Sequence, residues 1–530
     1  MNCPTDPSPL KRRLPIFLLL LLVFAGGLAF RLTRLADRPM HPDEAVQAAI
    51  FRGLWQEGQY RYNPDEFHGP TMIYATLPSV WLGDAETFAE STPWTYRIVP
   101  VFFGAGVILL VWLLRDALGK PAVICAAVLV AVSPAMVFYS RYYIHEMLLV
   151  FFTLAAIGAG WRYVRSGRLA WCLAAGASIG LMQATKETAV FSYAAAGVAM
   201  GLAWLWERRW RERPRDDSPA KPLWHLAAAA AMAVVVAAVL YSSFFTNPEG
   251  LIDAALTYLP WLGRAAGDSP HIHPWYFYLH RLAFWRLADG PVWSEGHILA
   301  LAAVGMIVAL IPRSNLLPGT GTRFARWLAF YTLLLFAVYS TIPYKTPWCM
   351  LEFLIGMILL AGLGAATLIR LIPMPPLKAA AGAVLLVAVG QLAWLSYRAS
   401  YVFPAEPCNP YVYAHTSPRI GELIDKLEEL TEASPAGNDV SIKVIWTDAY
   451  YWPLPWYLRG YQRTELWTKV PTDPAAPLVL SAEAHDEALT KKLDDTHLMT
   501  GFYEVRPQVF VQLWVRMDLW EAHLRRLGRI

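Results

Sequence analysis

Residues 347–369 read PWCMLEFLIGMILLAGLGAATLI, an apolar run of the length that crosses a lipid bilayer. A membrane-spanning helix needs about 20 such residues, and in lipid it must satisfy its backbone polar groups internally. Ten further runs resemble this one in length and composition. The eleven predicted spans are 14–33, 94–114, 120–139, 146–164, 169–185, 187–206, 223–245, 297–312, 326–343, 347–369 and 378–397. The sequence therefore predicts a polytopic α-helical membrane protein.

The composition of the whole chain agrees with this prediction. Of the 530 residues, 56% are hydrophobic and only 16% are charged, against about 25% in soluble domains. Such a composition excludes a disordered chain and disfavours a water-soluble enzyme. The net charge of +4 is weak and dispersed, so no nucleic-acid partner is expected. The five cysteines have no paired spacing, so neither structural disulfides nor a thiol metal cluster is predicted.

Basic residues flank the spans unevenly. A Lys-Arg-Arg sequence at residues 11–13 precedes the first span, and further Lys and Arg residues lie in alternate junctions. The opposite junctions, near residues 141, 186 and 345, hold one basic residue each. Because cytoplasmic segments carry the excess of Lys and Arg, the N-terminus is predicted to be cytoplasmic. An odd number of spans then places the C-terminal segment outside, and residues 34–93 and 246–296 become long outer loops.

From about residue 399 the charge content rises and the apolar runs shorten. Residues 417–431 are predicted to form an amphipathic helix, and residues 440–446, 477–480 and 509–515 to form strands. Alternating helices and strands are typical of a small α/β domain. We therefore expect a transmembrane domain over residues 1–398 and an extracytoplasmic α/β domain over residues 399–530.

The first outer loop is predicted to contain two helices, from Asp43 to Trp55 and from Thr71 to Leu82. The first begins within the sequence His41-Pro42-Asp43-Glu44. Adjacent carboxylates near a region of low dielectric have pKa values that are pushed apart, which suits a general base or a cation ligand. Acidic residues in the first turn of a helix also interact favourably with the helix dipole. Both interpretations of the acidic pair stay open.

Charged residues also stand at three short outer junctions. Arg141 and Glu146 lie between the third and fourth spans, Lys186 lies between the fifth and sixth, and Tyr344-Lys345 lies between the ninth and tenth. Charges at the end of an apolar helix are costly unless they are paired or functional. Arg141 and Glu146 could therefore simply pair with each other. The presence of all these charges on one predicted face favours a site for an anionic group, such as a lipid phosphate, next to a reacting hydroxyl.

The second outer loop contains His271 and His273, and Glu66 and His68 of the first loop could complete a metal site with them. A divalent metal ion of unknown identity is one prediction. The alternative is a loop in which the histidines pack on aromatic residues. The sequence has no phosphate-binding glycine motif, and its cytoplasmic loops are too short for a nucleotide-binding domain. No nucleotide cofactor is therefore expected, and a sugar donor would have to come through the membrane.

Several of these motifs resemble those of the GT-C glycosyltransferases, in particular the branch with protein O-mannosyltransferases and the lipid A aminoarabinose transferase. The similar features are the acidic motif of the first loop, Arg141 with Glu146, Lys186, and the Lys345-Thr-Pro347 motif. More narrowly, four stretches resemble a bacterial and archaeal family named for its association with flippase activity. They are MHPDEA, HGPTMIY, the IPYKTPW run, and NPYVYAHTSP with YYWPLPWYLRG in the tail.

The resemblance implies the GT-C fold and transfer of a sugar from a polyprenyl-phosphate carrier in the bacterial cytoplasmic membrane. The acceptor would be a hydroxyl of an unknown glycan, lipid or protein at the outer face. By the same resemblance Asp43 is the general base, Glu44 supports it, and Glu146 positions the acceptor or a cation. The residues that would hold the lipid phosphate are Arg141, Lys186 and Lys345. The residues that would line the donor and acceptor are His41, His68 and Tyr344.

The chain departs from the family pattern in two places. Glu146 stands where relatives often have Asp, and its longer side chain changes its reach. His68-Gly69-Pro70 stands where some relatives have Lys-Pro-Pro, which weakens the case for a phosphate contact and strengthens the case for a histidine metal ligand.

Two functions without catalysis fit part of the same pattern. A lipid-linked-sugar flippase, or an accessory subunit of one, would also bind a lipid phosphate through a cationic outer face. A flippase would need polar residues deep within its spans, and such residues are scarce here. A scaffold protein whose tail binds envelope polymers would leave the convergence of charges unexplained.

Overall fold

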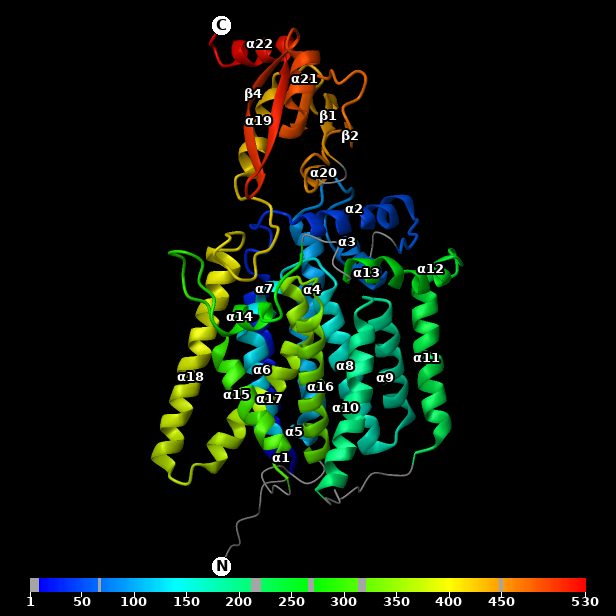
Figure 1. Cartoon of the computed structure of the whole chain (residues 1–530), viewed down its shortest axis with the longest axis vertical. Helices are drawn as coiled ribbons and strands as arrows, with labels where there is room; N and C mark the ends of the chain where they lie inside the picture. Colours follow the sequence, from blue (N-terminus) through cyan, green and yellow to red (C-terminus); the bar gives the residue numbers. More distant parts are fainter. Residues whose placement is uncertain (1–8, 65–67, 211–220, 266–270, 313–320, 448–450) are drawn as a thin grey trace, which may run out of the picture. The chain divides into compact units, whose positions relative to one another are not determined.

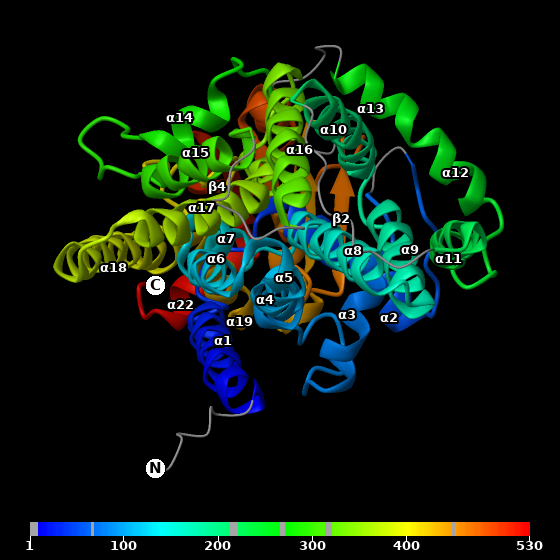
Figure 2. The same ribbon diagram turned by 90° about the horizontal axis from the view of Figure 1, so that it is seen from below.

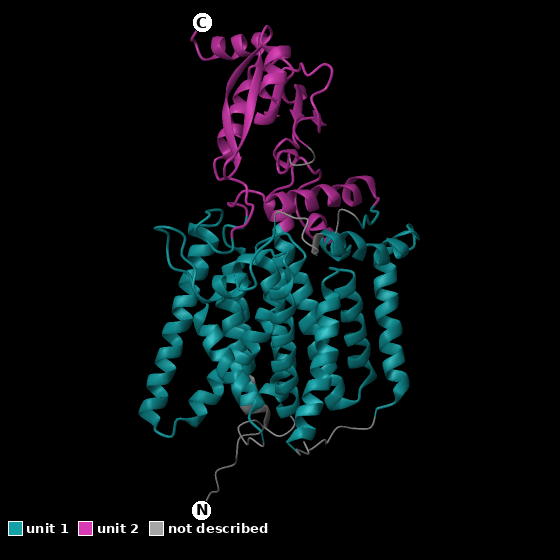
Figure 3. Cartoon of the chain, viewed as in Figure 1, with its two compact units in different colours: residues 1–35, 60–76, 97–411 teal, residues 36–59, 77–96, 412–530 magenta. Residues whose placement is uncertain are grey.

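The computed structural model describes residues 9–64, 68–210, 221–265, 271–312, 321–447 and 451–530. The chain forms two compact units (Figure 3). Unit 1 comprises residues 1–35, 60–76 and 97–411, and unit 2 comprises residues 36–59, 77–96 and 412–530. The first predicted outer loop thus contributes two segments to unit 2. The division between the units near residue 411 also differs from the expected boundary at residue 399.

Unit 1 is a bundle of α-helices (Figure 1). Short segments connect most of its successive helices. They are α1 (Pro9–Leu32), α4 (Pro93–Leu110), η1 (Val111–Leu114), α5 (Arg115–Leu118), α6 (Lys120–Val132), α7 (Pro134–Tyr139), α8 (Glu146–Ser166), α9 (Leu169–Gln183), α10 (Ala189–Arg209), α11 (Leu223–Tyr241), α12 (Gly250–Leu256), α13 (Tyr258–Ala265), α14 (Phe277–Ala283), α15 (Gly296–Leu310), α16 (Gly321–Thr341), η2 (Pro347–Met350), α17 (Leu351–Leu371), α18 (Pro375–Tyr397) and the π-helical turn η3 (Arg398–Val402). Helix α3 (Thr71–Trp81) begins in unit 1 and ends in unit 2, and the first turn of α4 belongs to unit 2.

Among the described residues, seven helical segments are long and apolar enough to cross a membrane. They are Pro93–Leu118, Glu146–Ser166, Ala189–Arg209, Leu223–Tyr241, Gly321–Thr341, Pro347–Leu371 and Pro375–Val402. Shorter apolar helices occupy the other four predicted positions, at Ile16–Leu32, Lys120–Val132, Leu169–Gln183 and Gly296–Leu310. The prediction of a polytopic helical membrane protein is confirmed, whereas the number of eleven spans stays a prediction.

The third predicted span, 120–139, is split into α6 and α7. The backbone leaves the helical conformation at Ser133, and Pro134 begins the next helix. Proline lacks a backbone N–H and disfavours a helical residue before it, so a break at this position is expected. The Ser133 hydroxyl accepts a hydrogen bond from the Met136 N–H at 3.4 Å and caps α7.

Helix α17 is the most buried span of unit 1, with 83% of its most apolar window buried, against 6% for α11. The view along the helices places α17 among α6, α15 and α16 and places α11 at the periphery next to α9 (Figure 2). Small residues permit the closest approach: a Cβ atom on Gly305 of α15 would overlap the Leu360 carbonyl of α17. The sequence run that predicted the fold is thus the core of the bundle.

Unit 2 contains a five-stranded sheet in the order β2-β1-β3-β5-β4. Strand β1 pairs in parallel with β2 and β3, whereas β5 pairs antiparallel with β3 and β4. The elements are α2 (Pro42–Glu57), α19 (Ile420–Glu432), η4 (Gly437–Asp439), β1 (Ser441–Ile445), α20 (Leu454–Tyr457), β2 (Arg463–Trp467), β3 (Leu478–Ala482), η5 (Glu483–His485), α21 (Asp486–Leu493), β4 (His497–Arg506), β5 (Val509–Arg516) and α22 (Met517–Arg526).

Helices cover both faces of this sheet. Leu423 and Leu427 of α19 share one apolar cluster with residues of β1, β3 and β5. Leu489 and Leu493 of α21 share a second cluster with Trp514 on β5. The predicted small C-terminal α/β domain is confirmed. Strands β2 and β4 were not predicted, because both lie at sheet edges, where the pattern of buried residues is weak.

Candidate functional site

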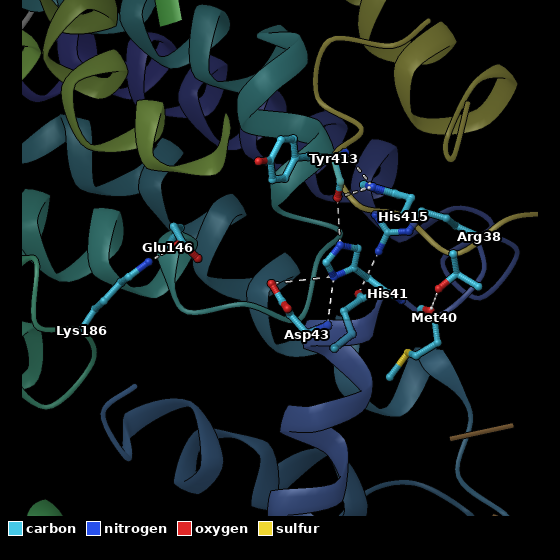
Figure 4. A network of polar contacts seen from close by, with 10 residues as sticks. Arg38, Met40, His41, Asp43, Glu146, Lys186, Tyr413 and His415 are labelled. Atoms are coloured by element: carbon cyan, nitrogen blue, oxygen red, sulfur yellow. Dashed lines mark hydrogen bonds and ion pairs between the residues drawn. The ribbon is translucent and has the colours of Figure 1, made fainter. Parts of the chain in front are cut away.

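Helix α2 of unit 2 begins directly after His41, and His41 caps it. Pro42 occupies the first turn, where its missing N–H costs nothing. The backbone N–H of Asp43 donates to Nδ1 of His41 at 3.0 Å (Figure 4). The backbone N–H of His41 donates to Oε2 of Glu44 at 3.0 Å. These reciprocal bonds form a capping box, which satisfies two N–H groups that the helix leaves unpaired.

Glu44 has both carboxylate oxygens engaged. Oε2 belongs to the capping box, and Oε1 accepts a hydrogen bond from the Arg38 guanidinium at 2.8 Å. Both side chains are buried. Of the two interpretations of the acidic pair, the one in which an acidic residue stabilises the first turn of the helix therefore describes Glu44.

Asp43 is in a different situation, although it is adjacent. Its side chain is 52% exposed, and its Oδ2 atom lies 3.9 Å from Nδ1 of His41. No group in the described part of the chain donates a hydrogen bond to its carboxylate. A carboxylate that keeps its acceptor capacity on a rigid helix start suits a general base.

His41 itself is held as a neutral imidazole. Because Nδ1 accepts from the Asp43 N–H, the ring proton is on Nε2, which donates to the Tyr413 carbonyl at 3.0 Å. The ring also packs edge-on against His415, with centroids 5.0 Å apart. Burial lowers the pKa of His41, although Asp43 and Glu44 oppose the shift. His41 therefore orients the helix start and is not placed to act as an acid.

Two tail motifs of unit 2 hold the segment that precedes Asp43. The Met40 N–H donates to the Tyr457 hydroxyl at 2.9 Å, and the Thr416 hydroxyl donates to the Met40 carbonyl at 2.6 Å. The partners Tyr413, His415, Thr416 and Tyr457 were not predicted as site residues. Their signal was present in the sequence, since all four lie in NPYVYAHTSP and YYWPLPWYLRG, the tail stretches that carry the narrower resemblance.

In unit 1, Glu146 forms a buried ion pair with Lys186 (Figure 4). Glu146 begins α8, and Lys186 lies between α9 and α10. Burial by itself would lower the pKa of Lys186, but the Glu146 carboxylate outweighs burial and raises it. The partner of Glu146 is thus Lys186 and not Arg141, which had been the local alternative.

The guanidinium of Arg141 binds the C-terminal end of α1. It donates to the carbonyls of Arg31 at 2.6 Å, Thr33 at 2.6 Å and Arg34 at 2.9 Å. It also lies over the Tyr401 ring at 4.6 Å. These carbonyls have no partner within the helix, so Arg141 completes the helix end.

His68 is the third predicted residue in this part of unit 1. Its ring stacks on Trp261 with centroids 4.9 Å apart, and its Nδ1 atom is 2.8 Å from Oε2 of Glu187. Burial would raise the pKa of Glu187, but His68 outweighs burial and lowers it. The next residue, Gly69, packs on the Ala184 carbonyl so closely that a Cβ would overlap it. The His68-Gly69-Pro70 motif is therefore locked beside the segment that carries Lys186.

Lys345 lies at the turn between α16 and η2, where its neighbour Tyr344 pairs with Ile272 in an isolated β-bridge. The Lys345 side chain is buried, and Nζ donates to the carbonyls of His273, at 3.0 Å, and Ile342. Burial lowers its pKa. Within the described ranges no carboxylate pairs with this ammonium group. A buried cation held only by carbonyls retains the capacity to bind an anion.

Aromatic contacts join Tyr344 to the rest of this cluster. Its ring lies 6.4 Å from Trp261, which covers His68, and 5.4 Å from His271. The structure thus brings His68, Tyr344 and Lys345 into one group of contacts in unit 1.

The predicted metal ligands engage other groups. The His271 ring packs edge-on against Tyr344, and the His273 ring stacks on Phe277 with centroids 4.2 Å apart. Burial, together with Arg281, lowers the pKa of His273 to about 4. No three His, Cys, Asp or Glu side chains among the described residues lie close enough to hold a metal ion. Glu66 lies outside the described residues, so a divalent metal stays a prediction, and no step below depends on it.

Comparison with solved structures concerns the fold of the chain. ArnT from Cupriavidus metallidurans, in a structure bound to undecaprenyl phosphate, matches 94% of this chain and 98% of its own, with a TM-score of 0.62 and 14% identity. The protein has the GT-C fold. The oligosaccharyltransferase AglB from Archaeoglobus fulgidus, in complex with an inhibitory peptide and a dolichol-phosphate, matches 97% of this chain and 77% of its own, with a TM-score of 0.52 and 13% identity.

Sequence comparison finds one match to a protein family, over part of the chain. The family model for dolichyl-phosphate-mannose-protein mannosyltransferases matches residues 77–247. That range includes Arg141, Glu146 and Lys186 but neither Asp43 nor Lys345. No curated protein matches the chain in sequence.

Proposed function

We propose that the protein transfers a sugar from a polyprenyl-phosphate carrier to a hydroxyl of a glycan, lipid or protein acceptor. The reaction takes place at the outer face of the bacterial cytoplasmic membrane, with the N-terminus in the cytoplasm and the C-terminal domain outside. The observation that carries the proposal is the carboxylate of Asp43, which is exposed at a rigidly capped helix start while its neighbour Glu44 is buried and paired. The GT-C fold supports it.

In this mechanism Asp43 accepts the proton of the acceptor hydroxyl. The acceptor oxygen then forms a bond to the anomeric carbon of the sugar, while the bond from that carbon to the phosphate oxygen breaks. The electron pair of the broken bond stays on the polyprenyl phosphate. Lys345, as a buried ammonium without a carboxylate among the described residues, stabilises the phosphate. Glu146, held by Lys186, positions the acceptor.

Arg141 contributes indirectly. Its three bonds to the end of α1 hold the segment from which unit 2 begins, rather than the phosphate itself. His41, His68 and Tyr344 line the donor and acceptor, and His41 acts through the position of Asp43.

The test is a reconstituted assay with the full chain in lipid vesicles. Synthetic polyprenyl-phosphate sugars serve as donors, and the carrier lipid that accumulates in a deletion strain, identified by mass spectrometry, selects the sugar. Release of polyprenyl phosphate together with glycosylation of the acceptor is the expected result. Movement of the lipid-linked sugar between leaflets without release of phosphate would identify a flippase and contradict the proposal.

A further inference from the structure

Helices α12 and α13 of unit 1 carry an exposed apolar stripe that the proposed mechanism does not use. Its side chains recur at the spacing of one helix face, and they are those of Ile252, Ala255, Leu256, Leu259 and Leu262. Leu259 and Leu262 are 65% and 66% exposed. Because contact between water and a continuous apolar surface is unfavourable, such a stripe indicates an apolar partner.

The opposite side of the same two helices is fixed to the bundle. Thr257, between α12 and α13, is buried. The hydroxyl of Tyr258 accepts a hydrogen bond from the Gln183 amide at 2.9 Å, and the Trp261 ring stacks on that of His68. The polar and aromatic side chains therefore contact the rest of unit 1, and the apolar stripe points away from it.

The turn that leads from α11 into α12 exposes two further apolar side chains. Ser243, Phe244 and Phe245 follow one another with φ angles of 49°, 58° and 70°. Residues with a Cβ atom rarely adopt this left-handed conformation, and for bulky residues it is strained. Phe244 and Phe245 are both exposed, Phe245 by 73%.

Hydrogen bonds hold this strained turn in place. The Ser243 hydroxyl donates to the Tyr60 carbonyl at 2.7 Å, and the Phe244 N–H donates to the Val239 carbonyl at 2.8 Å. Strain of this kind persists only where the surrounding structure fixes it, and it indicates a function for the residues concerned. Here the turn keeps two aromatic side chains, those of Phe244 and Phe245, on the surface.

The turn and the stripe continue the surface of α11. Only 6% of the most apolar window of this spanning helix is buried, so most of its surface faces lipid. Gly250, the first residue of α12, packs so closely on the Tyr241 carbonyl at the end of α11 that a Cβ atom would overlap it. Both views place α12 and α13 at the rim of unit 1, across the ends of the spans (Figure 1, Figure 2).

We propose that the stripe of α12 and α13, together with Phe244 and Phe245, inserts into the lipid leaflet at this end of α11. An amphipathic helix at a membrane lies in the plane of the interface with its apolar face among the acyl chains. The partner is the acyl chains of bilayer phospholipids, because the stripe adjoins a lipid-facing span and carries no charged side chain. In the proposed orientation this is the outer leaflet.

The lipid contact has a consequence for the candidate site. Trp261 lies on the same helix as Leu259 and Leu262, so insertion of these leucines holds its ring against His68 and near Tyr344. This consequence rests on the proposed function, in which His68 and Tyr344 line the donor and acceptor. The lipid contact itself does not depend on that function.

Photoreactive lipid tests the contact on the unaltered full chain. Vesicles of phosphatidylethanolamine and phosphatidylglycerol contain a phosphatidylcholine with a diazirine in its acyl chain, and mass spectrometry locates the labelled residues after illumination. We expect label on α11 and on residues 244–262, but not on Phe502, an exposed aromatic residue of β4 in unit 2. Label on α11 without label on residues 244–262 would overturn the proposal. Crosslinks between residues 244–262 of two copies would also overturn it, because they would identify a second chain as the partner.

A double variant, Leu259→Asn with Leu262→Asn, tests whether lipid holds the helix. Both side chains are exposed, so the bundle should fold as in wild type. Amide hydrogen exchange in vesicles should become faster in α13 and stay unchanged in α17, and the lipid label on α13 should decrease. Leu466→Asn, which alters an exposed leucine of β2, is the matched control and should change neither signal. Exchange in α13 at the wild-type rate in the double variant would overturn the proposal.

The donor KM provides the functional readout. The double variant should raise the KM for the lipid-linked donor severalfold and leave the KM for the acceptor unchanged, a division that a general loss of stability would not produce. An unchanged donor KM together with faster exchange in α13 would overturn the effect of the helix on the site. An absence of transfer by the wild-type chain, with the expected lipid label, would instead contradict the proposed function alone.

Discussion

The two charged regions of the molecule differ in how their charges are used. At the start of α2 in unit 2, the charges are adjacent in sequence: Glu44 pairs with Arg38 and closes the helix cap, while Asp43, one residue earlier, remains exposed. Packing therefore places two neighbouring carboxylates in different environments: that of Glu44 is buried and paired, and that of Asp43 is exposed.

In unit 1 the charges come from distant parts of the chain. Glu146 pairs with Lys186, and Arg141 binds the carbonyls at the end of α1. Lys345 is the buried cation that, among the described residues, has only carbonyl partners. In the proposed mechanism one charged group of each region acts on the substrates: the carboxylate of Asp43 in unit 2 and the ammonium group of Lys345 in unit 1. Glu44 and Arg141 bind groups of the protein, Glu146 and Lys186 pair with each other, and the first predictions below test Asp43 and Lys345.

The largest effect is expected for Asp43→Asn. Removal of the general base should lower kcat by about 10²- to 10⁴-fold, because a positioned base contributes a factor of this order. The side chain is 52% exposed, so the melting temperature and membrane insertion should not change. Turnover of the purified variant in reconstituted vesicles is the measurement.

The matched control is Glu57→Gln, which neutralises another exposed carboxylate at the far end of the same helix. It should have wild-type turnover. Glu44→Gln should behave differently from both, with a lower melting temperature, because it removes the negative charge that pairs with the buried Arg38 guanidinium. Normal turnover by Asp43→Asn would refute the assignment of the base.

Lys345→Ala should have the second largest effect, and it should act on the donor. A hydrogen bond to a charged group is worth about 1.5–3 kcal/mol, so the KM for the lipid-linked donor should rise roughly tenfold to a hundredfold. The KM for the acceptor should change much less. Initial rates measured over a range of donor concentrations, with the acceptor saturating, separate the two constants.

Arg141→Gln is the comparison for Lys345→Ala, since it removes a cation that binds the end of α1. It should lower the melting temperature and leave the ratio of donor to acceptor KM unchanged. A donor KM that stays at the wild-type value in Lys345→Ala would exclude a phosphate role for this residue.

Much of the fold could be predicted because its signals are local. The length of an apolar run can be read from the sequence without knowledge of any distant contact. All eleven predicted runs coincide with apolar helices. The α/β tail was recognisable from its helix at residues 417–431 and three buried strands. Strands β2 and β4 escaped because edge strands bury few side chains. The membership of residues 36–59 and 77–96 in unit 2 depends on contacts with the tail, which no local pattern reveals.

The candidate site was predictable in its residue types but not in its pairing. Glu146 is five residues from Arg141 and forty from Lys186, and sequence distance favours the wrong partner. Asp43 and Glu44 both carry a carboxylate, and the contacts that distinguish them, those of Glu44 with Arg38 and with the His41 N–H, appear only in the structure.

The smallest effect is expected from the titration of His41. Burial lowers the pKa of this histidine from its ordinary value of 6.5, so the folded chain keeps it neutral where the unfolded chain binds a proton. Stability should therefore fall as the pH drops below about 6.5, by at most about 1.4 kcal/mol per pH unit. His41→Asn, which keeps a good capping residue that does not titrate, should show a shallower loss of stability on acidification.

Melting temperatures of the full chain at about pH 7.5 and about pH 5.5 provide the comparison, because acid protonates Nδ1 and removes the acceptor for the Asp43 N–H. Tyr457→Phe is the control: it removes the hydroxyl that accepts a hydrogen bond from the Met40 N–H, and a tyrosine hydroxyl does not titrate between these two pH values, so the variant should lower stability equally at both. If wild type and His41→Asn lose stability equally in acid, His41 does not hold the helix start. The exposure of Asp43 beside the buried Glu44 would then need a cause other than the histidine cap.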